Sequence, residues 1–158
     1  MKYFKFLFTF LSLLLLFSCD STFSKRNEFE SEFKNHTFDS DSILFDGDPL
    51  HPTYAFIKNE KITALEFNSK PECGKVIKRY FLNYNEEIEK IIIEKDFYSE
   101  YCGKPFDSIY VIEPTKTTKI KMYTISTDGK EIINEKLFDN YKIDINNYRQ
   151  KIKNWHSR

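Results

Sequence analysis

The sequence has few glycines and prolines and no excess of charge of either sign. It holds four glycines and five prolines in 158 residues, and 24 basic side chains balance 24 acidic ones. So few glycines leave little material for the glycine-rich loops that hold nucleotide phosphates, and no GxSxG motif occurs. Balanced charge gives no electrostatic basis for binding nucleic acid. We therefore expect no nucleic-acid partner and no cofactor.

The side chains that usually carry catalysis or bind metals are scattered along the chain. Three histidines lie far apart, without the spacing of metal ligands: His36, His51 and His156. Four glutamates on predicted strands or at their ends are candidates for an acid–base pair: Glu66, Glu94, Glu100 and Glu113. Carboxylates in such positions are far more often solvated or paired with lysine. We therefore expect no metal site and no catalytic residues, and a cell-envelope hydrolase is the least favoured hypothesis.

The longest apolar run is too short to cross a membrane. It covers residues 6–17, which is 12 residues, whereas a membrane-spanning helix needs roughly 20. Lys2 and Lys5 precede the run, and Cys19 and the first acidic residue, Asp20, follow it. This pattern is typical of an export signal that is removed from the mature protein.

The end of this signal resembles the lipobox of bacterial lipoproteins. Leu16-Phe17-Ser18-Cys19 has an aliphatic residue at −3, a small residue at −1 and the obligatory cysteine. The resemblance implies that Cys19 carries a diacylglyceryl group, that residues 1–18 are removed, and that two or three acyl chains anchor the protein durably. The protein would then be bound to a membrane of the bacterial cell envelope and face the periplasm or the cell exterior. An ordinary secretory signal with a chance cysteine would also export the chain.

The other two cysteines form a natural pair if Cys19 carries lipid. Cys73 and Cys102 would then lie in an oxidising compartment, where a disulfide is the default state. They enclose 28 residues, and closing a loop of that size is worth about 3–4 kcal/mol. Neither CxxC spacing nor a neighbouring histidine base suggests a redox or nucleophilic role. We predict a structural disulfide.

The mature chain divides into an acidic lead-in, residues 19–50, and one β-rich domain, residues 51–158. The lead-in has eight acidic and three basic residues, and we expect about residues 20–36 to form a polar tether between lipid and domain. Phe29 and Phe33 are four residues apart and could form a short helix face. Roughly 140 residues suit a single domain with one core.

Residues 53–138 show the pattern of consecutive strands joined by hairpin turns. The expected strands are 53–58, 61–68, 74–84, 87–98, 108–113, 117–126 and 130–138. Turns are expected at Asn59-Glu60, Asn85-Glu86 and Asp128-Gly129. The second turn places Cys73 opposite about residue 98. The sequence therefore predicts an antiparallel meander of about six to eight strands, as an open sheet or a partly closed barrel.

The C-terminal residues predict a helix that covers this sheet, at about residues 144–156. Asp144 is a suitable N-cap. An apolar stripe recurs after it at helical spacing: Ile145, Tyr148, Ile152 and Trp155. The consecutive isoleucines 91–93 indicate a central strand that is covered on both faces. The expected fold class is α+β, mainly β.

Aromatic residues offer the main clue to function. Five tyrosines in the central hairpin and the segment after it are candidates for an interaction face: Tyr80, Tyr84, Tyr98, Tyr101 and Tyr110. Core packing and cross-strand pairing could also account for them. The leading hypothesis is a non-enzymatic, lipid-anchored envelope protein that binds another protein or a polymer, as an inhibitor or immunity-type module. The alternative is a carrier of small apolar ligands with a lipocalin-like barrel.

Overall fold

The computed structural model describes residues 21–114, 119–124, 127–132 and 134–157. The strands are β1 (Ser42–Asp46), β2 (Thr53–Lys58), β3 (Lys61–Ser69), β4 (Gly74–Leu82), β5 (Ile88–Phe97), β6 (Phe106–Glu113), β7 (Lys119–Thr124), β8 (Thr127–Ile132) and β9 (His156–Ser157). The helices are α2 (Ser21–Thr37), α3 (Glu135–Tyr141) and α4 (Ile145–Lys151), with 3₁₀ turns η2 (Glu100–Cys102) and η3 (Ile152–Asn154).

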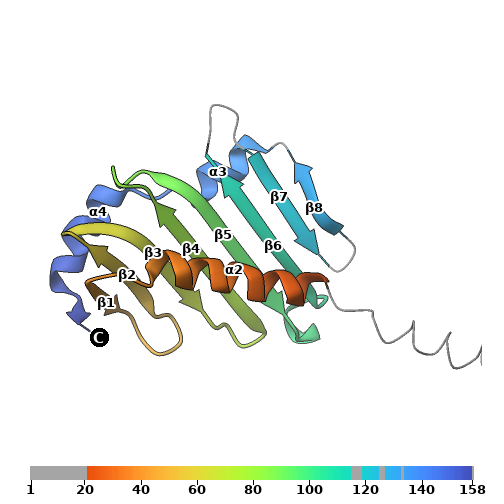
Figure 1. The fold of residues 1–158 in the computed structure, drawn as a ribbon. Helices are drawn as coiled ribbons and strands as arrows, with labels where there is room; N and C mark the ends of the chain where they lie inside the picture. The colour runs from red at the N-terminus through yellow and green to blue at the C-terminus, as the bar shows by residue number, and fades with distance from the viewer. Residues whose placement is uncertain (1–20, 115–118, 125–126, 133, 158) are drawn as a thin grey trace, which may run out of the picture.

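These strands form one open antiparallel sheet. Its nine strands lie in the order β8-β7-β6-β5-β4-β3-β2-β1-β9, so β1 to β8 follow their order in the sequence (Figure 1). The short β9 comes from the far end of the chain and pairs with β1. The predicted meander is confirmed. The partly closed barrel is wrong, because β8 and β9 are the two edges of an open sheet.

Helices cover both faces of the sheet, which creates two apolar cores. On one face, Phe29 and Phe33 of α2 pack in one core with the side chains of Phe81 and Ile92. The predicted stripe of α4 and η3 packs against the other face, together with residues of α3. Figure 1 shows α2 crossing the strands in front of the sheet, with the C-terminal helices behind it.

The isoleucines of β5 show why both layers are needed. Ile91 and Ile93 belong to the core under the C-terminal helices, while Ile92 belongs to the core under α2. All three side chains are fully buried. Successive side chains of a strand point to opposite faces, so three consecutive apolar residues require a cover on each side.

The predicted tether is wrong, because the chain from residue 21 to residue 37 is helix α2 and packs on the sheet. Among the side chains described for this helix, those of residues 24–37, Phe29 and Phe33 are the buried apolar ones, and the others are mainly polar. The predicted boundary at residue 50 also moves, because β1 pairs with β2, with Leu44 opposite Ala55. From residue 21 onward, the lead-in is therefore part of the folded domain.

Two of the three predicted turns differ from the prediction. Asn59-Glu60 connects β2 to β3 as expected, with positive φ angles of 50° and 63°. The next turn is wider and spans residues 83–87, because the Asn83 side chain accepts hydrogen bonds from two backbone N–H groups within it. Asp128-Gly129 lies inside β8, where the pairing with β7 shifts and Gly129 has a φ of 65°. The chain between these strands, residues 125–126, lies outside the described residues.

The C-terminal helix begins where the sequence predicts. The side chain of Asp144 caps α4 by accepting a hydrogen bond from the N–H of Asn146 at 3.0 Å, and η3 continues the helix to Asn154. The end of the strand expected over residues 130–138 is wrong, because α3 begins at residue 135. The Asn134 side chain caps that helix by accepting from the N–H of Leu137 at 3.2 Å.

The predicted disulfide joins Cys73 and Cys102, whose Cα atoms are 5.9 Å apart. As expected, Cys73 lies beside residue 98, where its carbonyl oxygen accepts a hydrogen bond from the N–H of Tyr98 at 3.0 Å. The turn η2 then brings Cys102 back toward the strand end. A disulfide of this kind favours an oxidising compartment outside the cytoplasm.

Candidate functional site

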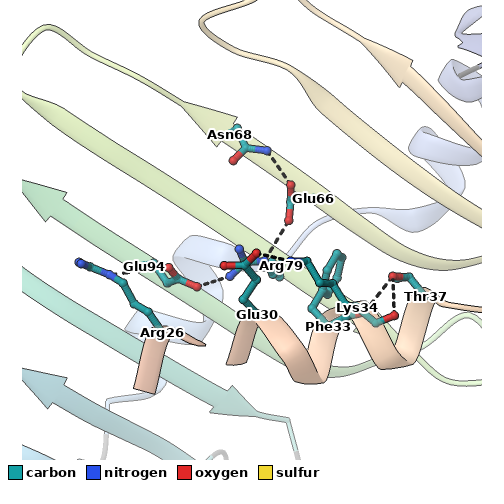
Figure 2. Close-up of polar contacts among 9 residues, drawn as sticks. All are labelled: Arg26, Glu30, Phe33, Lys34, Thr37, Glu66, Asn68, Arg79 and Glu94. Carbon is teal, nitrogen blue, oxygen red and sulfur yellow. Dashed lines mark hydrogen bonds and ion pairs between the residues drawn. The ribbon is translucent and has the colours of Figure 1, made fainter. Parts of the chain in front are cut away.

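The most buried charges of the described chain meet beneath α2. Arg79 on β4 and Glu94 on β5 are only 5% and 6% exposed. Nε of Arg79 donates a hydrogen bond to Oε2 of Glu66 on β3 at 2.9 Å, and Nη1 of Arg79 donates another to Glu94 (Figure 2). The guanidinium therefore bridges carboxylates from the strands on either side of β4.

Strand register explains this arrangement. Glu66 lies directly opposite Arg79 across the β3–β4 pairing. On the other side, Arg79 lies opposite Ile92, so Glu94 is its diagonal neighbour on the same face. The Asn68 side chain completes the set by donating a hydrogen bond to Oε1 of Glu66 at 2.7 Å.

Arg26 of α2 extends this cluster to the helix. Asp96 and Asp107 lie directly opposite each other on β5 and β6, a pairing of like charges that destabilises a sheet. Nη1 of Arg26 lies 3.4 Å from Oδ2 of Asp96, Nη2 donates to Asp107, and Nε lies 3.8 Å from Oε2 of Glu94. Arg26 therefore compensates these carboxylates and holds the first turns of α2 against β5 and β6.

Burial sets the electrostatics of this cluster. Desolvation raises the pKa of the Glu94 carboxyl above its ordinary value, and the neighbouring Arg79 and Arg26 act in the opposite direction. At the surface of α2, by contrast, a hydrogen bond from Lys34 lowers the pKa of Glu30. The charge of the buried Glu94 carboxylate thus depends on the neighbouring arginines, while the Glu30–Lys34 ion pair remains in contact with water.

The structure brings together two of the four glutamates considered as an acid–base pair. Glu66 and Glu94 share Arg79, so its guanidinium lies between the two carboxylates. Glu100 lies in η2 and Glu113 at the end of β6, away from this cluster. With the contacts of Arg26, this geometry is that of a structural ion-pair network that joins strands β3 to β6 and helix α2.

The cavities beside α2 have charged walls. One of about 260 Å³ is lined by Arg26, Arg79 and Glu94, among others. Another of about 320 Å³ extends over Glu66 and Asn68. Neither offers the apolar interior that a lipocalin-like carrier needs.

His36 lies at the end of α2, between two larger cavities. Its Nε2 is 3.0 Å from the carbonyl oxygen of Thr63. A cavity of about 390 Å³ on one side is lined by Lys61 and Tyr84, among others, and one of about 450 Å³ on the other side by Glu113 and others. The other histidines lie elsewhere, in the loop after β1 and in β9. Within the described ranges, no group of three or more His, Cys, Asp or Glu side chains is arranged to hold a metal ion.

The five tyrosines predicted as an interaction face do not share one surface. Tyr80 is buried under the C-terminal helices, where its hydroxyl donates to a carbonyl oxygen of α3 at 2.9 Å and burial raises its pKa. Tyr110 is half-buried on the same face. Tyr84 lies in the loop after β4, whereas Tyr98 and Tyr101 lie beyond the opposite end of β5.

Exposed aromatic side chains instead gather at two opposite ends of the sheet. One set consists of Tyr98, Tyr101 and Phe106, which lie close in sequence to Cys102 of the Cys73–Cys102 disulfide. We call this end of the sheet the disulfide end. We call Phe38 and Tyr84 the cavity end; they are 89% and 77% exposed.

Phe38 is not among the residues predicted as an interaction face, because it follows a segment that was expected to be a tether. Its neighbour Asp39 lines the cavity of about 390 Å³ and forms an ion pair with Lys58. Tyr84 lines the same cavity, and Nζ of Lys61 lies 3.6 Å from its ring centroid. The end of α2 therefore places Phe38 next in the chain to Asp39, which lines the cavity that Tyr84 also lines.

Comparisons with protein-family models, curated proteins and solved structures find no match to this chain. Among the helices that the structure describes, none is long and apolar enough to span a membrane.

Proposed function

We propose that the protein is a lipid-anchored lipoprotein of the bacterial cell envelope that binds another envelope protein without catalysis, as an inhibitor or immunity-type module. The lipobox-like residues that end at Cys19 support the anchor. The Cys73–Cys102 disulfide supports a location outside the cytoplasm.

The cavity end is the observation that carries the binding role. Large aromatic rings that remain exposed in a folded protein mark interaction surfaces, because they gain most when a partner removes them from water. Tyr84 is exposed and lines a cavity of about 390 Å³, and the exposed Phe38 directly precedes Asp39, which lines the same cavity together with Lys58 and Lys61. Aromatic residues are enriched in protein interfaces, and the charged groups of the lining suit the polar rim that surrounds the core of an interface.

The buried charge cluster supports a structural scaffold rather than a reactive centre. Glu66 and Glu94, the two carboxylates that come closest to an acid–base pair, are both engaged by Arg79 beneath α2. A substrate would have to displace that guanidinium from between them. The network fixes α2, and α2 in turn positions Phe38.

Site-specific photocrosslinking in cells tests the binding role. A photoreactive residue in place of Asn85, which is exposed in the loop beside Tyr84, should yield one discrete crosslinked protein species. The combined change Phe38→Ser and Tyr84→Ser should reduce this species at least about tenfold, because exposed aromatic anchors supply much of an interface's binding energy.

The matched control is Leu50→Ser, which removes an exposed apolar side chain from the loop before β2 and should leave the crosslink intact. An unchanged yield after the Phe38 and Tyr84 changes would contradict a binding role for the cavity end. A photoreactive residue at Lys130, exposed on edge strand β8, reports background crosslinking.

The anchor has its own test. Cys19→Ala should move the protein from the membrane fraction to the soluble fraction, because the lipid-bearing thiol is lost. Mass spectrometry of the wild-type N-terminal peptide should show acyl chains on Cys19. An N-terminus elsewhere, or an unmodified Cys19, would contradict the lipoprotein assignment.

A further inference from the structure

Helix α2 begins two residues after the proposed lipid site. A fully extended chain covers at most about 3.6 Å per residue, so Ser21 lies within about 7 Å of the Cys19 backbone. If Cys19 carries lipid, the first turn of α2 must therefore lie close to the lipid headgroups. No length of chain remains for a tether.

The start of α2 lies at the disulfide end of the sheet. Arg26, in the second turn, contacts Asp96 and Asp107. Asp96 directly precedes Phe97, and Asp107 directly follows Phe106. The rings of Phe97 and Phe106 stack with their centroids 4.8 Å apart. Figure 1 shows the start of α2 beside the start of β6, the strand that follows η2 in the chain.

The helix cannot swing away from this position without breaking both kinds of contact that hold it. Phe29 and Phe33 are buried in the core beneath α2, and Arg26 bridges carboxylates of two strands. Seventeen helical residues extend about 25 Å, so the other end of α2, and Phe38 after it, lie far from the anchor. The attachment point therefore fixes which end of the domain faces the membrane.

The disulfide end has the chemistry of a membrane-contact surface. Tyr98 and Tyr101 are 65% and fully exposed, and Phe106 is about half exposed. Tyrosine is enriched at the level of lipid headgroups because its ring is apolar and its hydroxyl is polar. Lys104, also exposed, places a positive charge beside them that suits a lipid phosphate.

These rings are held on a constrained segment. Cys73–Cys102 closes it, and the Ser99 hydroxyl caps η2 by accepting a hydrogen bond from the N–H of Tyr101 at 3.3 Å. Little conformational freedom is lost when such a segment meets a surface, which favours even a shallow contact.

We propose that the disulfide end rests in the headgroup layer of the membrane that carries the Cys19 lipid, with Tyr98, Tyr101 and Phe106 as its contact residues. This proposal rests on the lipid anchor proposed above. The cavity end then faces away from the membrane, where an envelope partner can reach Phe38 and Tyr84. The aromatic residues at the two ends have different roles: one orients the domain and the other binds.

Fluorescence quenching in vesicles tests this orientation. The full-length mature protein with its lipid is reconstituted into phosphatidylethanolamine–phosphatidylglycerol vesicles that contain lipids with brominated acyl chains. Trp155→Phe removes the single native tryptophan, and Tyr101→Trp or Tyr84→Trp then introduces one at either end. We expect emission from position 101 to fall by about half and emission from position 84 to change by less than about one tenth, as for rings inside and outside the interface.

The outcomes distinguish this proposal from the anchor on which it rests. Protein that floats with the vesicles but shows no quenching at position 101, or equal quenching at both positions, overturns the membrane-contact proposal alone. Protein that does not float and carries no lipid on Cys19 overturns the anchor, and the orientation with it. A photoreactive residue at position 101 should form adducts with lipid; adducts with a protein instead would overturn the proposal. If Trp155→Phe fails to fold, the same comparison is made with Trp155 retained and the parental emission subtracted.

Discussion

Replacement of Arg79 by methionine is the sharpest test of the buried cluster. Methionine retains most of the apolar stem of arginine, so the change removes the charge without opening a large cavity. Glu94, 6% exposed, and Glu66 then lose the guanidinium that they share. Breaking a buried ion pair by removing one partner costs about 3–5 kcal/mol, because a buried charge is left uncompensated. That is a large part of the roughly 5–15 kcal/mol that stabilises a typical domain.

Urea unfolding followed by Trp155 fluorescence measures this loss. The ring of Trp155 packs against the core beneath the C-terminal helices, so its emission reports global unfolding. With a urea dependence of about 2 kcal/mol per molar, a loss of that size lowers the midpoint by about 2 M. Lys34→Met, which removes the partner of Glu30 at the surface of α2, is the matched control and should cost at most about 1 kcal/mol.

A compensating variant separates charge from packing. Adding Glu66→Leu and Glu94→Leu to Arg79→Met replaces the three charges with apolar groups, and buried ion pairs replaced in this way often lose little stability. We expect the triple variant to recover most of the midpoint. An Arg79→Met cost no larger than that of Lys34→Met, or a triple variant as unstable as the single one, would refute the argument.

Three further predictions concern the elements around this cluster. Phe33→Ala should lower the free energy of unfolding by about 3–5 kcal/mol in the same assay, because it leaves a cavity between α2 and the sheet. The combined change Cys73→Ser and Cys102→Ser should lower it by about 3–4 kcal/mol, and alkylation of the unreduced mature protein should label neither cysteine. The raised pKa of Glu94 means that the folded state binds this proton more tightly than the unfolded state. Wild-type stability relative to Glu94→Gln should therefore fall as the pH rises from below the ordinary value of 4.5 through the higher folded-state pKa, in urea titrations at successive pH values.

Each of these has a result that would count against it. Phe38→Ala, which removes an 89% exposed ring, is the control and should change the free energy of unfolding by less than about 0.5 kcal/mol. If Phe33→Ala lowered the free energy of unfolding no more than Phe38→Ala does, the docking of α2 would be contradicted. Labelling of both Cys73 and Cys102 would contradict the disulfide. A stability difference between wild type and Glu94→Gln that does not change with pH would contradict the shifted pKa.

The parts of the fold that could be predicted depend on strong local signals. Three consecutive isoleucines at 91–93 require a covered strand, and Asp144 before an apolar stripe marks a helix start. The pairing of Cys73 with Cys102 followed from the assignment of Cys19 to lipid, which leaves these two cysteines as the remaining pair. The isoleucine run and the helix start are each encoded within a short stretch of sequence.

Helix α2 could not be predicted in the same way, because its stability comes from distant residues. Its apolar face in the core consists of Phe29 and Phe33, and its main ion-pair partners lie on strands β5 and β6. Likewise, the carboxylates that Arg26 and Arg79 compensate become neighbours only through strand register, which a single sequence specifies weakly. Asp128-Gly129, a strong turn signal, was absorbed into β8 at a shift in the pairing.

The tyrosine face failed for a related reason. Tyr80 and Tyr84 are four residues apart in the sequence, yet one is in the core and the other is in a loop beyond the strand end. Residue type alone does not distinguish these two environments. The exposed rings lie at opposite ends of the sheet, and this pattern becomes visible only when the ends of the strands are known.

Helix α2, the chain next to the proposed lipid site, is docked on the sheet, and we propose that it seats the domain directly on the membrane. Amide hydrogen exchange of the vesicle-bound mature protein tests whether the helix stays docked there. We predict that residues 29–37 of α2 exchange as slowly as the central strands β4 and β5, because the helix opens only when its aromatic and ionic contacts break. Exchange of this segment at the rate of an unstructured peptide, while β4 and β5 remain protected, would show that α2 is a flexible tether and not a docked helix.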